Sequence, residues 1–470
     1  MNGSSTLQFS LGNSISPRSM GVKLILVCGL ALLMGIPTIF VAVLVNERTH
    51  RAKDVISEVS RQVGGAQTFL GPTLAIPYTL PSGKGDVPAN HSVYLVFPAR
   101  ASAELKTSTE ERHRSLFRVP VYQADLKFDA DFDFSDVPAS VPEGADLNWS
   151  RAEIIVGVTG PHGALTDAVL SVDHKALTLV PAGIIGTLPL DRDGNPRARL
   201  ALFSVRPGDA LKAQAPLHVT STLRFSGAEH VAVLAYGKTT QLTAEGDWPD
   251  PGFDGEILPV SRNVTGHGFT AKWSVPFIAR GVRAQGPIDS ISGLNTTALG
   301  LSFVEMTDPY QSVNRSLKYA LLFFGLVFLS YFVFEVTAGK RVHPAQYILV
   351  GIAQVIFYLL LLSVSERIGF DWGFLLSGGA TVILLSANAG WIFSNRLQGI
   401  RALLIFSALY SLIYLLLRLE DNALLIGAIA SFLIVAAAMY LTRSIDWYNA
   451  PKRTDTSSAQ MMPSPPAPTR

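Results

Sequence analysis

Long apolar runs occupy the beginning and the last third of the chain. The first run, residues 24–45, contains 22 residues and no charge. As a helix rising about 1.5 Å per residue it would reach roughly 33 Å, enough to cross a hydrocarbon core of about 30 Å. It is longer than the ~7–15-residue apolar core of a signal peptide, so the pattern predicts an uncleaved membrane anchor, with cleavage as the alternative. Five further runs follow Ser316 and are separated by short linkers: 317–338, 347–364, 374–393, 402–419 and 423–442.

Six spanning helices are therefore expected to form a bundle, because a helix satisfies its own backbone hydrogen bonds in lipid. Basic residues in short loops indicate the orientation, since they concentrate on the cytoplasmic side. One side of the predicted spans carries seven of them: Lys340, Arg341, Arg396, Arg401, Arg443, Lys452 and Arg453. The opposite side carries Arg367 and, close to its loop, Arg418. Both termini are thus expected in the cytoplasm. Basic residues just after the first span point the other way, but a long translocated segment follows this rule poorly.

The polar middle of the chain alternates with a period of two. From Leu126 to Phe134 the even positions are apolar and the odd positions are charged, and Leu217 to Phe225 nearly repeats this pattern. Such alternation is typical of antiparallel strands with one buried face. Further strands are expected at 92–97, 153–158, 176–180, 230–236, 241–248 and 269–275. About a dozen strands would form one large β-sandwich or two smaller ones.

A short amphipathic helix is expected between the first span and the strands. Val55, Ile56, Val59 and Val63 recur at helical spacing, and Gly64-Gly65 supplies a stop. Packing of this helix on its own domain is favoured over a partner-binding face.

The expected fold class is a mixed membrane protein, with a multi-span α-helical bundle and a large periplasmic all-β, antiparallel, sandwich-like domain. The expected organisation is a cytoplasmic tail (1–23), transmembrane helix 1 (24–45), a periplasmic β-rich domain with a short leading helix (46–316), five transmembrane helices (317–442) and a largely disordered cytoplasmic tail (443–470).

Composition narrows the class of protein. Only 16% of the residues are charged and the mean hydropathy is +0.31, which argues against a soluble cytoplasmic enzyme and against a disordered chain. The net charge of +2 lacks the basic excess of a nucleic-acid binder. The single cysteine, Cys28, excludes an internal disulfide and a cysteine-based metal site.

The sequence contains no recognisable catalytic or cofactor signature: no H-E-x-x-H, G-x-S-x-G, Walker A, GxGxxG or C-x-x-C motif. No cofactor, resident metal or catalytic residue is therefore expected. Asp129, Asp131 and Asp133 share the polar face of one strand, and three such carboxylates can bind a cation such as Ca²⁺. A solvated strand face is the favoured interpretation.

Polar residues in or beside the apolar runs are the remaining site candidates: Glu335, His343, Asn388 and Arg418. A carrier would be expected to hold charges near mid-membrane, whereas nearly every charge here is terminal. An interfacial ion pair of Glu335 with Lys340 or Arg341 is favoured over a transport role, and Asn388 is expected to bridge helices.

At several places the chain resembles the CreD family of bacterial inner-membrane proteins. The residues that carry the resemblance are Asn46-Glu-Arg48 to Arg61, Leu70-Gly-Pro72 to Pro77, Tyr310 to Tyr319, Phe332 to Glu335, Arg341-Val-His343-Pro344 to Gly351, Phe357 to Glu366, Ala423 to Gly427, and Leu441 to Tyr448. The resemblance implies an inner-membrane protein with a large periplasmic domain, associated with a two-component regulatory system, envelope integrity and tolerance to certain colicins or β-lactams. The family has no established reaction, so no catalytic residue is carried over.

Three functions remain open. The leading hypothesis is a non-enzymatic envelope protein whose periplasmic domain contacts lipid, cell-wall material or another envelope protein. The alternative is a small-solute or lipid transporter or channel built on the C-terminal helices. A periplasmic glycan hydrolase, using paired carboxylates, ranks last. The expected partners are the lipid bilayer and an unknown envelope component, with no nucleic acid.

Overall fold

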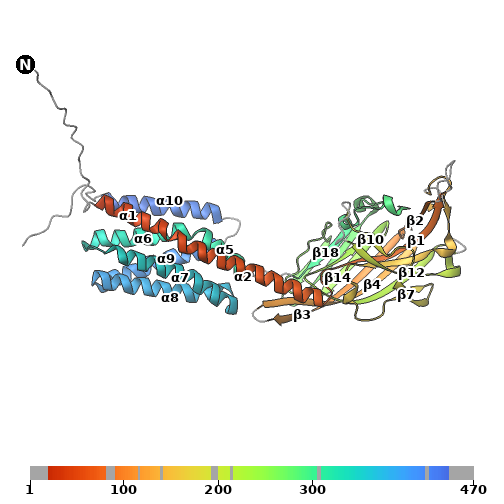
Figure 1. The fold of residues 1–470 in the computed structure, drawn as a ribbon, viewed down its shortest axis with the longest axis horizontal. Helices are drawn as coiled ribbons and strands as arrows, with labels where there is room; N and C mark the ends of the chain where they lie inside the picture. Colours follow the sequence, from red (N-terminus) through yellow and green to blue (C-terminus); the bar gives the residue numbers. More distant parts are fainter. Residues whose placement is uncertain are drawn as a thin grey trace, which may run out of the picture. The chain divides into compact units, whose positions relative to one another are not determined.

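The computed structural model describes residues 20–80, 90–114, 117–137, 141–191, 199–211, 215–303, 309–418 and 423–443. The predicted tails lie almost entirely outside these residues. The chain divides into two compact units, which are described in turn (Figure 1). Unit 1 combines Met1–Thr49 with Thr307–Arg470, and unit 2 is His50–Met306.

Unit 1 is a bundle of apolar helices. Among the described residues, five helical segments are long and apolar enough to cross a membrane: Gly21–Gln62, Ala320–Ala338, Pro344–Ile368, Phe370–Phe393 and Arg396–Arg418. The helices of the bundle are α1 (Met20–Leu33), α2 (Gly35–Gln62, which continues into unit 2), α5 (Pro309–Lys318), α6 (Ala320–Ala338), α7 (Pro344–Ile368), α8 (Phe370–Phe393), α9 (Arg396–Arg418) and α10 (Ala423–Thr442). Helix α10 occupies the sixth predicted run, and α9 begins six residues before the predicted run at 402.

The first predicted span is interrupted rather than continuous. Helix α1 ends at Leu33 and α2 begins at Gly35. Pro37 explains the break, because proline has no N–H to donate to the carbonyl of Leu33 four residues earlier. The Thr38 hydroxyl donates to the carbonyl of Met34 at 2.8 Å, one residue after the carbonyl that loses its donor.

Unit 2 is a β-sandwich of two sheets (Figure 1). The ten-stranded sheet contains β1 (Gln67–Leu80), β2 (Asn90–Val96), β5 (Asp146–Leu147), β6 (Glu153–Val158), β9 (Val180–Pro181), β10 (Thr187–Pro189), β11 (Arg199–Val205), β13 (His230–Leu234), β17 (Gln285–Pro287) and β18 (Ala298–Ser302). The eight-stranded sheet has the order β15 (Ser261–Thr265), β16 (Gly268–Val275), β14 (Thr239–Gly246), β3 (Arg100–Arg114), β4 (Phe117–Phe132), β12 (Leu217–Ala228), β7 (Val169–Val172) and β8 (Lys175–Thr178).

One hydrophobic core joins the two sheets. Phe69 of β1 packs edge-on against Phe225 of β12 with ring centroids 5.2 Å apart, and Phe128 of β4 packs likewise against Tyr236, which follows β13, at 5.4 Å. These rings come from opposite sheets and belong to a single cluster of buried residues. The middle of the chain is therefore one large sandwich, not two smaller ones.

Two features of the sandwich correct the sequence expectation. The described residues form eighteen strands rather than about a dozen, and two strand pairs are parallel: β1 with β13, and β3 with β14. Alternation reports which face of a strand is buried and carries no information on the direction of its neighbour. Because each parallel pair joins strands far apart in the sequence, local patterns gave no sign of it.

The leading helix packs on its own domain, as its spacing predicts. Val59 of α2 and Val63, which directly follows α2, form a cluster with Val119, Val121 and Ala228 of β4 and β12. The helix ends at the predicted glycines, where Gly64 and Gly65 have φ angles of 105° and 72°. Such positive φ angles favour glycine over residues with a side chain.

A buried glutamine holds the chain where the helix gives way to the sheet. The Gln67 amide donates to the carbonyls of Gly64 and Gly160 at 2.8 and 2.9 Å, and its oxygen accepts from the N–H of Gly160 at 3.1 Å. The approach is so close that a Cβ on Gly64 would lie 2.7 Å from the Cα of Gly163. All of the polar atoms of this buried side chain are thereby paired.

Candidate functional site

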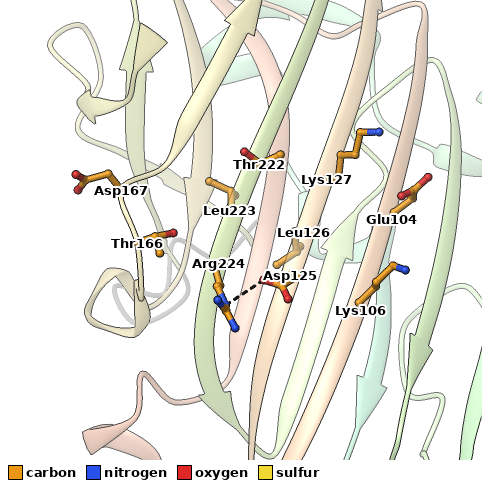
Figure 2. Close-up of a pocket in the computed structure, with 10 residues that line it drawn as sticks. All are labelled: Glu104, Lys106, Asp125, Leu126, Lys127, Thr166, Asp167, Thr222, Leu223 and Arg224. Atoms are coloured by element: carbon orange, nitrogen blue, oxygen red, sulfur yellow. Dashed lines mark ion pairs between the residues drawn. The ribbon is translucent and has the colours of Figure 1, made fainter. Parts of the chain in front are cut away.

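A charged pocket lies on the solvent-facing side of the eight-stranded sheet. It has a volume of about 340 Å³ and is built from β3, β4, β12 and the segment before β7 (Figure 2). Its lining residues are Glu104, Lys106, Asp125, Leu126, Lys127, Thr166, Asp167, Thr222, Leu223 and Arg224. We call this set the sheet groove. Strand alternation creates it, since the charged residues of each strand point outward while Leu126 and Leu223 are buried in the core.

Opposite charges are interleaved in the sheet groove. Lys127 stands across from Glu104 on one neighbouring strand, and Asp125 stands across from Arg224 on the other. Arg224 Nε lies 3.2 Å from Asp125 Oδ1. This ion pair is exposed, so it contributes little to stability.

Three charged residues of the sheet groove, Glu104, Lys127 and Asp167, stay unpaired among the described residues. Lys127 and Asp167 form no ion pair or side-chain hydrogen bond there, and they lie on opposite sides of Thr222 and Leu223 in Figure 2. By contrast, Lys106 lies 2.6 Å from Glu245, and this hydrogen bond raises the pKa of Lys106 above its ordinary value. The sheet groove can therefore offer a free ammonium group and a free carboxylate to one ligand.

The three carboxylates considered as an alternative cation site do not form a unit. Asp129 and Asp131 flank His218 of β12, whose Nδ1 lies 2.8 Å from Asp131 and whose Nε2 lies 3.6 Å from Asp129. Asp133 instead accepts from the N–H of Ser135 at 3.0 Å, which lowers the pKa of Asp133. The groups that do lie together, within 4.8 Å of one another, are Asp129, Asp131 and His218, so the alternative of a site made of three carboxylates is wrong in its third member.

His218 was missed because only strand register places it opposite Asp131. The hydrogen bond to Asp131 raises the pKa of His218 above its ordinary value. With a carboxylate at each ring nitrogen, this arrangement favours the imidazolium form over the neutral imidazole that binds a metal ion.

Glu335 is the centre of a buried polar network in unit 1. Its carboxylate forms an ion pair with Lys23 of α1 and accepts hydrogen bonds from the Val342 N–H and the Tyr347 hydroxyl, each at 3.0 Å. Lys23 also donates to the carbonyl of Val342 at 2.8 Å. Only 2% of the Glu335 side chain is exposed.

The expected partners of Glu335 were therefore wrong. The nearby Lys340 turns away and donates to the carbonyl of Phe393 at the end of α8, at 2.9 Å. The cation that pairs with Glu335 comes from the first helix, and nothing in the local sequence around residue 335 indicates this partner.

The other three candidates make contacts that position helices. The His343 side chain accepts from the N–H of Ala345 and caps the start of α7. Asn388 of α8 donates to the Tyr331 hydroxyl of α6 at 3.4 Å, and that hydroxyl donates to the Leu385 carbonyl at 2.6 Å. Arg418 forms an ion pair with Asp371 at the start of α8.

The buried ion pair can be tested with a double-mutant cycle. Removing one member of a buried pair leaves the other charge uncompensated, so Lys23→Met and Glu335→Gln should each lower the free energy of unfolding by about 3 kcal/mol. The double variant should lose less than the sum of the two by about 1–3 kcal/mol. Denaturant titration of the full-length protein in detergent micelles measures these values.

Lys340→Met is the matched control for this cycle. Combined with Glu335→Gln, its effect should add to within about 0.5 kcal/mol, because the two side chains do not interact. Strong coupling of Glu335 to Lys340, with none to Lys23, would overturn the assignment.

Comparison with known proteins gives one consistent result. The family described as Inner membrane protein CreD matches residues 19–448. The chain is also 30% identical over 431 residues to the Inner membrane protein CreD of Escherichia coli (strain K12), covering 89% of this chain and 92% of that protein. The match runs through both units and includes the elements that carry the sheet groove and the Glu335 network. The chain therefore belongs to the CreD family of inner membrane proteins.

Proposed function

We propose that this inner membrane protein is a non-enzymatic binding protein of the bacterial envelope. In this proposal the β-sandwich lies in the periplasm, and the sheet groove binds an envelope component that carries both an ammonium group and a carboxylate. Binding would contribute to envelope integrity and tolerance of envelope stress. The observation that carries the proposal is the pair of unpaired opposite charges, Lys127 and Asp167, in one pocket.

The character of the pocket favours binding over catalysis. Its three carboxylates, on Glu104, Asp125 and Asp167, are all exposed to solvent. A glycosidase needs a carboxylic acid that an apolar pocket keeps protonated. Exposed, interleaved charges instead suit a peptide-like or zwitterionic ligand, which gains charge complementarity at both ends.

Contacts within unit 1 support a cytoplasmic location for both termini. Lys23 at the start of α1 contacts Val342 of the α6–α7 linker, while Lys340 of this linker contacts the end of α8. One end of the bundle thus gathers the basic linkers. Because basic loops concentrate on the cytoplasmic side, we propose that this end faces the cytoplasm and that residues 46–316 are periplasmic.

Cysteine labelling tests this orientation. In a Cys28→Ser background, Asn263→Cys on exposed strand β15 should react with a membrane-impermeant maleimide in intact cells. Arg341→Cys, in the α6–α7 linker, should react only after the inner membrane is permeabilised. The reverse pattern would reject the proposed topology and, with it, a periplasmic ligand.

Site-specific photocrosslinking tests the sheet groove. A photoreactive amino acid at Thr222, inside the groove, should yield an adduct in the envelope fraction. The same residue at Asn263 should not, although that position is exposed on another strand of the same sheet. Lys127→Glu should reduce the adduct several-fold, whereas Lys175→Glu, on β8 outside the groove, should leave it unchanged. Identical adducts from positions 222 and 263, or no adduct from position 222, would contradict the proposal.

A further inference from the structure

Buried polar side chains in the described residues are, as a rule, paired. Gln67 uses every polar atom of its amide, and three buried tyrosine hydroxyls donate to backbone carbonyls: Tyr122 to His230, Tyr236 to Ser102 and Asp129, and Tyr331 to Leu385. This is the expected behaviour, since a buried polar atom without a partner forfeits the hydrogen bonds it would make in water.

The centre of the helical bundle breaks this rule. Both polar atoms of the Gln354 amide and the Tyr358 hydroxyl are buried without a partner, and the Tyr410 hydroxyl, which forms no hydrogen bond of ordinary geometry, has the Thr381 hydroxyl beside it. Gln354 and Tyr358 are 0% exposed, and Tyr410 is 4% exposed. We call these three residues the central polar cluster. In unit 2 the described residues leave only one such atom, a terminal nitrogen of Arg280, whose Nε donates to the Ala235 carbonyl.

The three side chains come from two neighbouring helices, α7 and α9. Gln354 and Tyr358 are one turn apart on α7, so they share a helix face. The ring of Phe357 lies 4.9 Å from that of Tyr358 and 5.0 Å from that of Tyr410 on α9. Helix α8 packs closely against Tyr410, because a Cβ on Gly378 would lie 3.3 Å from the Tyr410 ring.

No charged side chain of the described helices α6 to α9 lies near the middle of its helix, where this cluster sits. The ionisable residues of α6 to α9 all lie toward helix ends: Glu335, Glu366, Arg367, Asp371, Arg396, Arg401 and Arg418. A small molecule bound at the cluster would contact one amide group, two phenol groups and aromatic rings. These groups suit an uncharged molecule that both donates and accepts hydrogen bonds.

We propose that the central polar cluster of Gln354, Tyr358 and Tyr410 is an internal water site in the helical bundle. Buried water typically makes about three hydrogen bonds to polar groups that would otherwise be unsatisfied. The Gln354 amide supplies donors and an acceptor, and the two hydroxyls supply both. Hydration therefore removes the penalty of leaving polar atoms of the cluster unpaired in a membrane interior, where lipid offers no partner.

Radiolytic hydroxyl-radical footprinting of the full-length protein in lipid nanodiscs tests this site, because radicals form from bound water next to the side chains. Tyr358 and Tyr410 should be modified several-fold faster than Tyr331, which is equally buried but donates to a backbone carbonyl. Equal rates for the three tyrosines would overturn the proposal.

A second measurement uses an apolar substitution. Gln354→Leu should lower the modification rate of Tyr358 several-fold, because it removes most of the hydrogen bonds that hold the water. Gln346→Leu, the same change on the same helix outside the cluster, should leave this rate unchanged. If Gln354→Leu instead raises the melting temperature and leaves the rate of Tyr358 as it was, the cluster is dry.

Discussion

The buried ion pair between Lys23 and Glu335 determines how the membrane helices are grouped. The two residues are 312 positions apart in the chain, yet their contact joins the start of α1 to the α6–α7 linker. Because Glu335 is almost fully buried and an unpaired buried charge is costly, arrangements that separate Lys23 from Glu335 are strongly disfavoured. The contact thereby holds α1 beside the end of α6, although the residues of the β-sandwich separate these two helices in the chain.

Polar groups are used differently in the two units. In the sandwich, Gln67 and the buried tyrosines pair with backbone groups, so polar side chains serve to fix chain segments in place. Charged side chains of the eight-stranded sheet lie on its solvent face, because successive residues of a strand point to opposite faces, and several of them line the sheet groove. In the bundle, Glu335 and Arg418 near helix ends are paired, whereas Gln354 and Tyr358 are buried without a partner. The fold thus offers an exposed, charged surface in one unit and an enclosed, uncharged polar site in the other.

Local patterns predicted the elements of this protein far better than their partners. The apolar runs correspond to helices, the alternation at Leu126–Phe134 corresponds to strand β4, and Gly64-Gly65 ends α2. The parallel pairing of β3 with β14, the His218–Asp131 contact and the partner of Glu335 depend on long-range arrangement, which no local pattern encodes. The sheet groove shares this limit, because its residues come from three strands and a preceding segment. The helix break before Gly35 could have been predicted from Pro37, because proline inside an otherwise continuous apolar run interrupts the helical hydrogen bonds.

The distance between labelled helix ends tests the grouping of the helices most directly. Helix α7 has 25 residues and is about 37 Å long, so the two ends of the bundle are well separated. Electron paramagnetic resonance on a Cys28→Ser protein with spin labels at Gly21 and Arg341 should give a distance much shorter than labels at Gly21 and Arg367. A longer distance to residue 341 than to residue 367 would place the start of α1 at the opposite end and contradict the account.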